Sequence, residues 1–160
     1  MQLKSITAIL VLSLVVASLL VSGCTSSQNT NTAPSAGGSA GGGLSFSAYQ
    51  VPISANDLAY GFYSEAAAQG YTYVGFYCTL TNSGASTYAT NVVILTLTTT
   101  TGTYTSSPYI YQKGEFPTGA ISLGNGQVVN GVALFQVPTG TTGFTSITYS
   151  DGPNNLVANL

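Results

Sequence analysis

The chain has 160 residues, and only 4% of them are Asp, Glu, Lys or Arg, compared with about 25% in an average globular domain. Lys4 and Lys113 are its only cations, and it has neither Arg nor His. This composition excludes nucleic acid as a ligand, because neutralising phosphates requires clusters of Lys and Arg.

The first 23 residues have the pattern of a secretory signal peptide. Lys4 precedes an uncharged, largely apolar segment from Ile6 to Val21, which is short for a stable membrane span. A positive charge on the N-terminal side directs the following chain out of the cytoplasm. We therefore expect residues 1–23 to be a signal peptide and the mature chain to face the extracytoplasmic side.

The end of this leader contains a cysteine in a specific context. Val21, Ser22 and Gly23 run directly into Cys24. These four residues resemble the lipobox of prokaryotic lipoproteins, in which the cysteine sulfur carries a diacylglyceryl group and the leader is removed before it. The resemblance implies that Cys24 anchors the protein to cell membrane lipid, and two acyl chains give durable attachment. The alternatives are an uncleaved anchor helix and an ordinary signal peptide cut elsewhere.

A linker is expected after the lipidated cysteine, over residues 24–43. From Thr25 to Gly43 the sequence contains no charge, no aromatic residue and no large aliphatic residue. Such a segment has nothing to bury, so it is expected to stay flexible, with an r.m.s. reach of roughly 25 Å.

Residues 44–160 are expected to form one domain made mainly of β-strands. β-branched and aromatic residues are frequent in this part of the chain, and both favour strands. The segment 56–70 is the one stretch with helical features, because Asn56 or Asp57 could cap a helix there. Gly61 lies inside it, so a loop or a short helix is expected.

The clearest strand is predicted over residues 71–82. Its apolar positions alternate with a second set, which indicates one face in the core: Val74, Phe76, Cys78 and Leu80 alternate with Tyr73, Gly75, Tyr77 and Thr79. Cys78 shares the core face, so it is interpreted as a small buried hydrophobe. No disulfide is expected, because Cys24 is the only other cysteine and is expected to be acylated.

Further strands follow at short intervals. Val93, Leu95 and Leu97 share one face of a strand, and a turn at residues 101–102 leads to a returning strand that runs to about Tyr111. Asn125 and Gly126 have the chemistry of a tight turn before a long strand that ends at Pro138. Residues 144–150 and 156–160 supply the last strands. About six to eight short strands with turns between them predict an all-β, antiparallel β-sandwich.

Three segments carry a resemblance to a known family. Residues 66–82, 97–107 and 123–138 resemble successive blocks of an immunoglobulin-like domain family common in prokaryotic lipoproteins, similar to the mycobacterial immunoprotective extracellular antigen. The resemblance is carried by Gly70, Asn82, Gly102, Tyr104, Gly126, Phe135, Val137 and Pro138. It implies an immunoglobulin-like β-sandwich in the cell envelope. It implies no reaction, because the molecular function of the family is largely unassigned.

The residues that common enzymes need are scarce in this chain. Without His there is no imidazole base for a nucleophile and no His-ligated zinc. The carboxylates are interpreted as solvated loop residues: Asp57, Glu65, Glu115 and Asp151. Residues 150–155 offer oxygen ligands but lack the spacing of a calcium loop. We therefore predict that the protein is not an enzyme and needs no cofactor or metal.

Tyrosines could supply a binding surface. Tyr71, Tyr73 and Tyr77 share the strand face opposite the core set, and Tyr109 and Tyr111 share another. Such rows can form a platform for a glycan. The alternative is that the tyrosines simply fill the outer face of a sheet, for which they have a high propensity.

Two predicted strands are apolar on both faces. Val92 and Ile94 lie opposite Val93 and Leu95, while Val132 and Leu134 lie opposite Ala133, Phe135 and Val137. Such strands are normally covered on both sides. The expected cover is the segment 45–69, and without that cover the surplus apolar patch would be a docking surface for a partner.

The functional expectation is a membrane-anchored cell-surface lipoprotein. Its immunoglobulin-like domain would bind another envelope protein noncovalently or serve as a structural envelope component. The alternative is a carbohydrate-binding module that uses its surface tyrosines.

Overall fold

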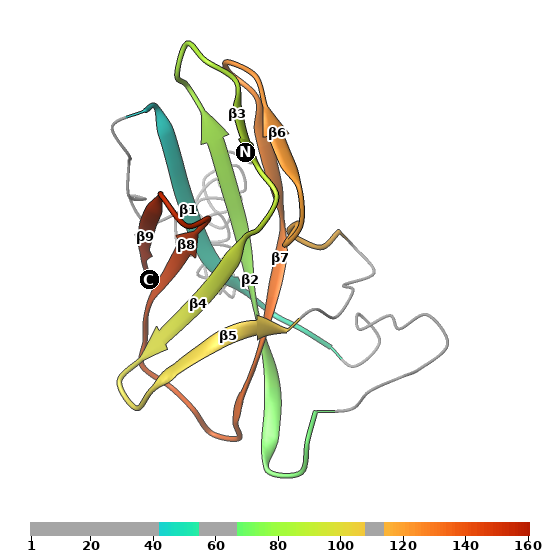
Figure 1. Ribbon diagram of the computed structural model, residues 1–160. Helices are drawn as coiled ribbons and strands as arrows, with labels where there is room; N and C mark the ends of the chain where they lie inside the picture. Colours follow the sequence, from blue (N-terminus) through green and yellow to red (C-terminus); the bar gives the residue numbers. More distant parts are fainter. Residues whose placement is uncertain (1–41, 55–66, 108–113) are drawn as a thin grey trace, which may run out of the picture. The chain divides into compact units, whose positions relative to one another are not determined.

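The computed structural model describes residues 42–54, 67–107 and 114–160, and within these ranges the chain is all-β (Figure 1). No helix long and apolar enough to cross a membrane occurs among them. Several expectations fall outside the described residues: the signal peptide, Val21, Ser22, Gly23 and Cys24 of the lipobox, the linker up to residue 41, the possible helix over 56–66, and Tyr109 and Tyr111.

The described residues contain nine strands. They are β1 (Leu44–Val51), β2 (Tyr71–Asn82), β3 (Tyr88–Thr90), β4 (Ile94–Thr99), β5 (Thr103–Ser107), β6 (Ile121–Leu123), β7 (Val128–Pro138), β8 (Phe144–Ser150) and β9 (Asn155–Asn159). The strands predicted from alternation and turns correspond to β2, β4, β5, β7, β8 and β9, so these predictions are confirmed. The sequence analysis did not predict β1, β3 and β6.

Seven of the strands form one antiparallel sheet in the order β1-β2-β7-β5-β4-β8-β9. The sheet is nearly closed, because its first and last strands, β1 and β9, lie alongside each other (Figure 1). The connection between β5 and β7 consists of two residue pairs, Ser106 with Phe135 and Ser107 with Leu134. A separate two-stranded sheet joins β3 to β6.

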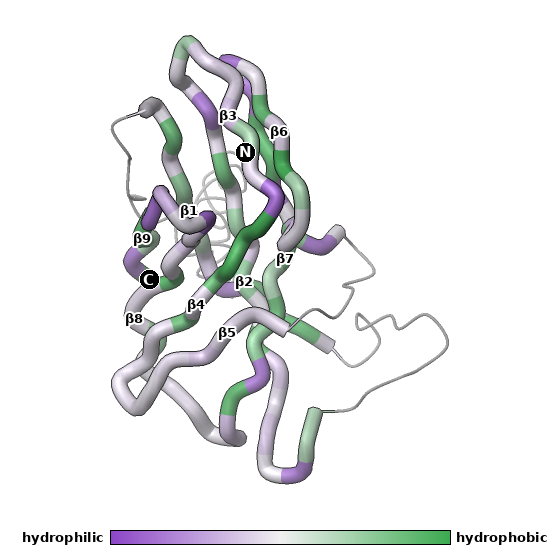
Figure 2. The backbone as a smooth tube through the Cα atoms, viewed as in Figure 1, coloured by the Kyte–Doolittle hydropathy of each residue, from purple (hydrophilic) through white to green (hydrophobic). Residues whose placement is uncertain are grey.

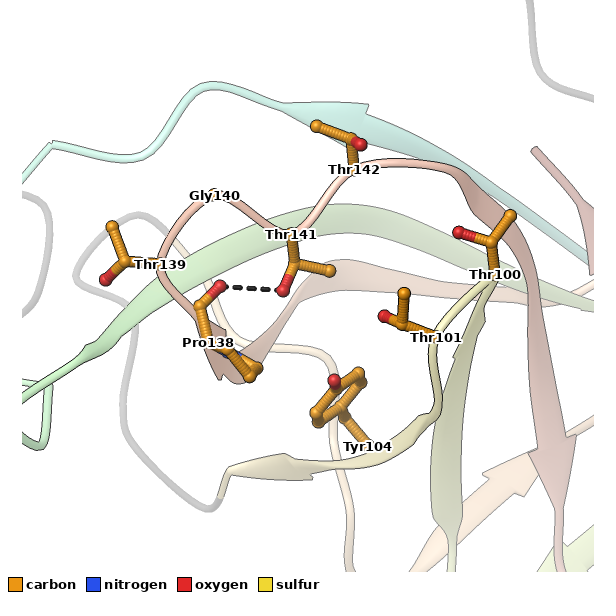
Figure 3. Close-up of a pocket in the computed structure, with 8 residues that line it drawn as sticks. All are labelled: Thr100, Thr101, Tyr104, Pro138, Thr139, Gly140, Thr141 and Thr142. Atoms are coloured by element: carbon orange, nitrogen blue, oxygen red, sulfur yellow. Dashed lines mark hydrogen bonds between the residues drawn. The ribbon is translucent and has the colours of Figure 1, made fainter.

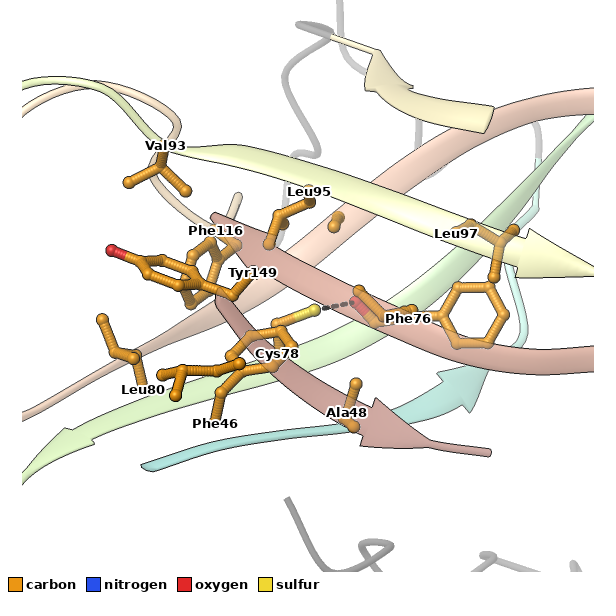
Figure 4. Packing of buried hydrophobic residues seen from close by; sticks show 14 of the residues in the cluster. Phe46, Ala48, Phe76, Cys78, Leu80, Val93, Leu95, Leu97, Phe116 and Tyr149 are labelled. Atoms are coloured by element: carbon orange, nitrogen blue, oxygen red, sulfur yellow. Dashed lines mark hydrogen bonds between the residues drawn. The ribbon is translucent and has the colours of Figure 1, made fainter. Parts of the chain in front are cut away.

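The enclosed faces of these strands form the main core. Figure 4 shows its centre, where residues from β1, β2, β4 and β8 meet Phe116. Of the alternating sets predicted for the core, all but Val74 are buried, and Val74 is half-buried against the core: Phe76, Cys78, Leu80, Val93, Leu95 and Leu97 are the buried members. Cys78 is a free, fully buried thiol whose Sγ donates to the Phe76 carbonyl oxygen at 3.6 Å. Burial raises the pKa of this thiol far above its usual value, which confirms that Cys78 behaves as a small hydrophobe.

Asn82 closes the end of β2 through its side chain. Its Nδ2 donates to the carbonyl oxygens of Ser86 and Leu123, both at 2.8 Å, and its Oδ1 accepts from the backbone N–H of Gly84 at 2.9 Å. The backbone N–H of Gly126, at φ +73°, donates to the Asn82 carbonyl oxygen at 2.7 Å. One buried amide therefore joins the end of β2, the following loop and β6, which satisfies polar groups that would otherwise be buried unpaired.

Candidate functional site

The predicted tyrosine row lies on the outer face of β1, β2 and β7. Tyr71 is 46% exposed. Tyr73 and Tyr77 are half-buried and pack against a second, smaller apolar cluster. Tyr77 also lies opposite Tyr49 of β1, with the two ring centroids 5.4 Å apart. The row is therefore an open aromatic platform only at Tyr71, because Tyr73 and Tyr77 serve largely as packing.

The same cluster corrects one candidate binding surface. Val132 and Leu134 are only 5% and 2% exposed, so these two residues are not an exposed docking surface. Val51 and Ile53 cover them, together with the two half-buried tyrosines. Val51 and Ile53 belong to the segment 45–69, so the expected cover is confirmed for Val132 and Leu134. It is wrong for Val92 and Ile94, which are 58% and 48% exposed. The sequence did not predict that Tyr73 and Tyr77 help to cover Val132 and Leu134. Alternation shows which face of a strand a residue occupies, but it does not show which residues pack against that face.

The outer face of the strands β5, β4, β8 and β9 remains open to solvent. Pairing between the strands places Thr105, Thr96, Thr148 and Val157 in one cross-strand row, and Thr103, Thr98, Ser146 and Asn159 in the next. A third row contains Ile94, Ser150 and Asn155. We call these eleven residues the hydroxyl face. They are all half-buried or exposed, with Ile94 at 48% and Val157 at 41%.

The hydroxyl face carries no charged side chain. Neighbouring strands lie about 4.8 Å apart, and alternate residues along one strand lie about 6.8 Å apart, so the hydroxyl groups form a regular grid. Figure 2 draws β5 almost white, which marks residues that are neither strongly hydrophobic nor strongly hydrophilic. Val92, 58% exposed, precedes this face at the start of β4. A surface of this kind suits a neutral partner.

A hydrogen-bonded cluster lies where the turn between β8 and β9 meets β3. The hydroxyl groups of Tyr88 and Tyr149 hydrogen-bond to each other, and Tyr88 also donates to Oδ2 of Asp151. Asn154 donates to the same carboxylate from its backbone N–H at 2.8 Å and from Nδ2 at 3.0 Å. The carboxylate of Asp151 therefore accepts three hydrogen bonds, and both of its oxygens are occupied.

These contacts shift the pKa values of the cluster. Burial alone would raise the pKa of Asp151, but the hydrogen bonds from Tyr88 and Asn154 bring it below its usual value. Burial raises the pKa of Tyr88, as do its hydrogen bonds to Asp151 and Tyr149. Burial likewise raises the pKa of Tyr149. The interpretation of Asp151 as a solvated loop residue is wrong, because its carboxylate ties the β8–β9 turn to β3.

Of the remaining carboxylates, the structure describes only Glu115. Glu115 is half-buried and lies beside Val132 of β7 in an isolated bridge, and desolvation raises the pKa of its carboxyl group. Asp57 and Glu65 lie outside the described residues. Within the described part of the chain, no three Cys, Asp or Glu side chains come together in a group that could hold a metal ion.

An open, shallow pocket with a mixed polar and apolar lining lies between the turn that joins β4 to β5 and the loop that joins β7 to β8. Its volume is about 430 Å³. It is lined by Thr100, Thr101, Tyr104, Pro138, Thr139, Gly140, Thr141 and Thr142. Figure 3 shows the ring of Tyr104 between Pro138 and Thr101. The sequence analysis did not predict this pocket, although two threonine- and glycine-rich segments, 98–102 and 139–143, mark its two sides.

Comparison with known proteins adds no identification: no family model, no curated protein and no solved structure matches the chain. What the described residues define is an all-β domain with an uncharged, hydroxyl-rich outer face and a threonine-lined pocket.

Proposed function

We propose that this chain is a lipid-anchored, extracytoplasmic protein whose immunoglobulin-like domain acts by noncovalent contact with a neighbouring envelope protein. The observation that carries the contact function is the hydroxyl face, which presents a four-stranded surface without any charged side chain. A neutral partner can meet such a surface without desolvating a charge. The exposed aliphatic side chains of Ile94 and Val157 add apolar area to the contact.

The order of the strands supports an immunoglobulin-like sandwich. In the constant-type domain, strands A, B, E and D form one sheet and strands C, F and G form the other. Here β1-β2-β7-β5 has the order of the first sheet and β4-β8-β9 that of the second. In this proposal β5 takes the position of strand D and also pairs with β4, which joins the two sheets into one.

The anchor is proposed from the lipobox alone. The experiment replaces Cys24 with Ala and fractionates the cells that produce the variant. The Cys24→Ala protein is expected to leave the membrane fraction, whereas Ser26→Ala, two residues further along, is expected to stay there. Equal membrane attachment of Cys24→Ala and the unchanged chain would refute the anchor.

The contact function is tested by crosslinking in intact cells. A photoreactive residue at Thr96, in the middle of the hydroxyl face, is expected to give a discrete protein adduct. A second substitution, Thr148→Lys, should abolish this adduct, because it places a charge opposite Thr96. The control is Thr87→Lys in the exposed loop before β3. An adduct that survives Thr148→Lys, or no adduct at all, would refute the proposed contact face.

The carbohydrate-binding alternative remains a second proposal. In the described part of the predicted row, only Tyr71 offers a freely exposed ring. A glycan array with Tyr71→Ala and Tyr73→Ala tests it: sugar binding that both substitutions reduce would favour the original tyrosine platform.

A further inference from the structure

We propose that the pocket between the β4–β5 turn and the β7–β8 loop binds a neutral glycan, with the ring of Tyr104 as the stacking surface. This inference goes beyond the contact function proposed above, because the pocket and the hydroxyl face share no residue. Either one can therefore fail without the other.

The first wall of the pocket is tied together by hydrogen bonds to Thr99, a residue only 7% exposed. Its Oγ1 accepts from the backbone N–H groups of Thr101 and Gly102, both at 3.1 Å, and donates to the Gly102 carbonyl oxygen at 3.0 Å. The backbone N–H of Thr99 donates to the same carbonyl at 2.8 Å. These bonds fix the turn that carries Thr100 and Thr101 and that precedes Tyr104.

The second wall of the pocket, formed by the loop after β7, is also held by hydrogen bonds. The backbone N–H and the Oγ1 of Thr141 both donate to the Pro138 carbonyl oxygen, at 3.1 Å and 2.7 Å. The backbone N–H of Thr139 donates to the carbonyl oxygen of Gly70, just before β2, at 2.9 Å. The loop is therefore tied to the end of β7 and to the turn before β2, and these bonds reduce the ordering that a ligand would have to impose.

The two walls meet at Thr100 and Gly143. The backbone N–H of Thr100 donates to the Gly143 carbonyl oxygen at 3.0 Å. Gly143 has φ +68°, and a Cβ atom at this position would lie 2.8 Å from Oγ1 of Thr100. A glycine is needed for this approach, so the two walls are joined by a close contact between Thr100 and the residue just before β8.

The lining determines the class of ligand. The side-chain hydroxyls of Thr100, Thr139, Thr142 and Tyr104 hydrogen-bond to no other group in the described part of the chain, so they are available to a ligand. An apolar ligand would leave these hydroxyls unpaired, and a charged ligand would lose hydration without gaining a counter-charge. Tyr104 and Pro138 supply apolar ring surfaces. Neutral polar groups beside an aromatic face suit a neutral sugar ring.

The experiment uses the purified full-length chain in titration calorimetry. The probes are neutral tri- and tetrasaccharides of glucose, mannose and N-acetylglucosamine, with oligogalacturonate as the charged counterpart. We expect saturable binding of at least one neutral oligosaccharide and none of oligogalacturonate. Tyr104→Ala should weaken binding at least tenfold, and Thr100→Val and Thr142→Val several-fold. Thr87→Val, an exposed threonine in the loop before β3, is the matched control and should bind like the unchanged chain.

Tyr104 also packs against the main core, so each variant is accompanied by its melting temperature. Thr100→Val keeps the side-chain volume and removes only the hydroxyl, which keeps the test valid if Tyr104→Ala fails to fold. Absence of neutral-sugar binding would overturn the proposal, as would binding that Thr100→Val and Thr142→Val leave unchanged. Binding lost in Tyr71→Ala but not in the pocket variants would also overturn it, in favour of the tyrosine row. The crosslink from Thr96 tests the contact face separately in every case.

Discussion

The side chain of Ile53 lies directly over Gly75, in the space where any other residue would carry its Cβ atom. A Cβ atom on Gly75 would be 2.4 Å from both Cγ1 and Cδ1 of Ile53. Gly75 lies within β2, opposite Val51 on one side and Leu134 on the other. The missing side chain therefore creates the space in which the chain after β1 folds back and covers Val132 and Leu134.

Replacing Gly75 with Ala should displace Ile53 and open this cover. We expect the free energy of unfolding to fall by about 1–2 kcal/mol, because a methyl group is forced into an occupied space. In an Ile53→Ala background the space is empty, and the same substitution should be nearly neutral. Urea unfolding of the four proteins in this double-mutant cycle gives the coupling energy. Equal losses in both backgrounds would contradict the contact.

Gly131 is more tightly confined than Gly75, because its neighbours are backbone atoms. A Cβ atom there would lie 2.4 Å from the Phe116 nitrogen and 2.5 Å from the carbonyl carbon and oxygen of Glu115. Gly131→Ala must separate β7 from the segment that carries the fully buried Phe116. We expect a loss of about 3 kcal/mol or more.

The matched control for this substitution is Gly119→Ala. A Cβ atom at Gly119 meets nothing within 4 Å. Thermal unfolding of the two variants is expected to show a large decrease for Gly131→Ala and almost none for Gly119→Ala. Similar melting temperatures for the two would show that β7 and the segment at 115–116 separate easily.

The predictions from sequence were most successful where alternation alone determines structure. The face of β2 with Phe76, Cys78 and Leu80 could be recognised because its other face carries a different kind of residue. β1 was missed although Leu44, Phe46 and Ala48 also alternate. Its pairing with β2 spans the segment between them, and no local pattern reports such a pairing.

The candidate sites depended still more on contacts between distant segments. The pocket needs Thr100 beside Gly143, and the β8–β9 turn needs Asp151 beside Tyr88. In sequence, these residues look like ordinary turn and strand positions, and only the order of the strands in the sheet brings them together. The sequence could therefore predict an all-β antiparallel domain and many of its core positions, but not which loops lie together.

The buried amide of Asn82 should be sensitive to a charge-changing substitution of almost the same shape. In Asn82→Asp, the carboxylate would face the carbonyl oxygens of Ser86 and Leu123, which now accept from Nδ2. We expect a loss of about 3 kcal/mol near neutral pH. Burial and these carbonyl groups raise the pKa of the new carboxyl group, so the loss should be present at neutral pH and shrink on acidification.

The measurement is urea unfolding of Asn82→Asp and the unchanged chain at matched pH values, near neutrality and below about pH 4. Asn91→Asp makes the same chemical change at an exposed position between β3 and β4, so it is the control and should have little effect at either pH. A deficit in Asn82→Asp that does not depend on pH would show that the amide contacts carry no charge-sensitive stabilisation.

The cluster of Tyr88, Tyr149 and Asp151 is expected to contribute to the pH limits of stability, together with the buried Cys78 thiol, whose raised pKa removes stability as the pH rises above its ordinary value of 9.0. Folding lowers the pKa of Asp151. Its contribution to the free energy of unfolding is therefore present above the ordinary pKa of 3.8 and is lost as the pH falls through the pKa of the folded state. The pKa values of Tyr88 and Tyr149 are raised, so their contributions are present below the ordinary value of 10.0 and are lost as the pH rises above it. Glu115 acts in the opposite direction to Asp151. Because folding raises the pKa of Glu115, a small contribution to the free energy of unfolding is lost as the pH rises above the ordinary pKa of 4.5.

The melting temperature is therefore expected to be almost constant between about pH 6 and pH 8 and to fall on both sides of this range, since the chain contains no His. Calorimetric scans across the range measure it. Asp151→Asn should flatten the acid side, because the neutral amide no longer titrates, and Tyr88→Phe should reduce the alkaline decrease. A melting temperature that changes steeply between about pH 6 and pH 8 would mean that another group titrates on unfolding, because the Asp151 carboxyl titrates below this window and the two tyrosines titrate above it.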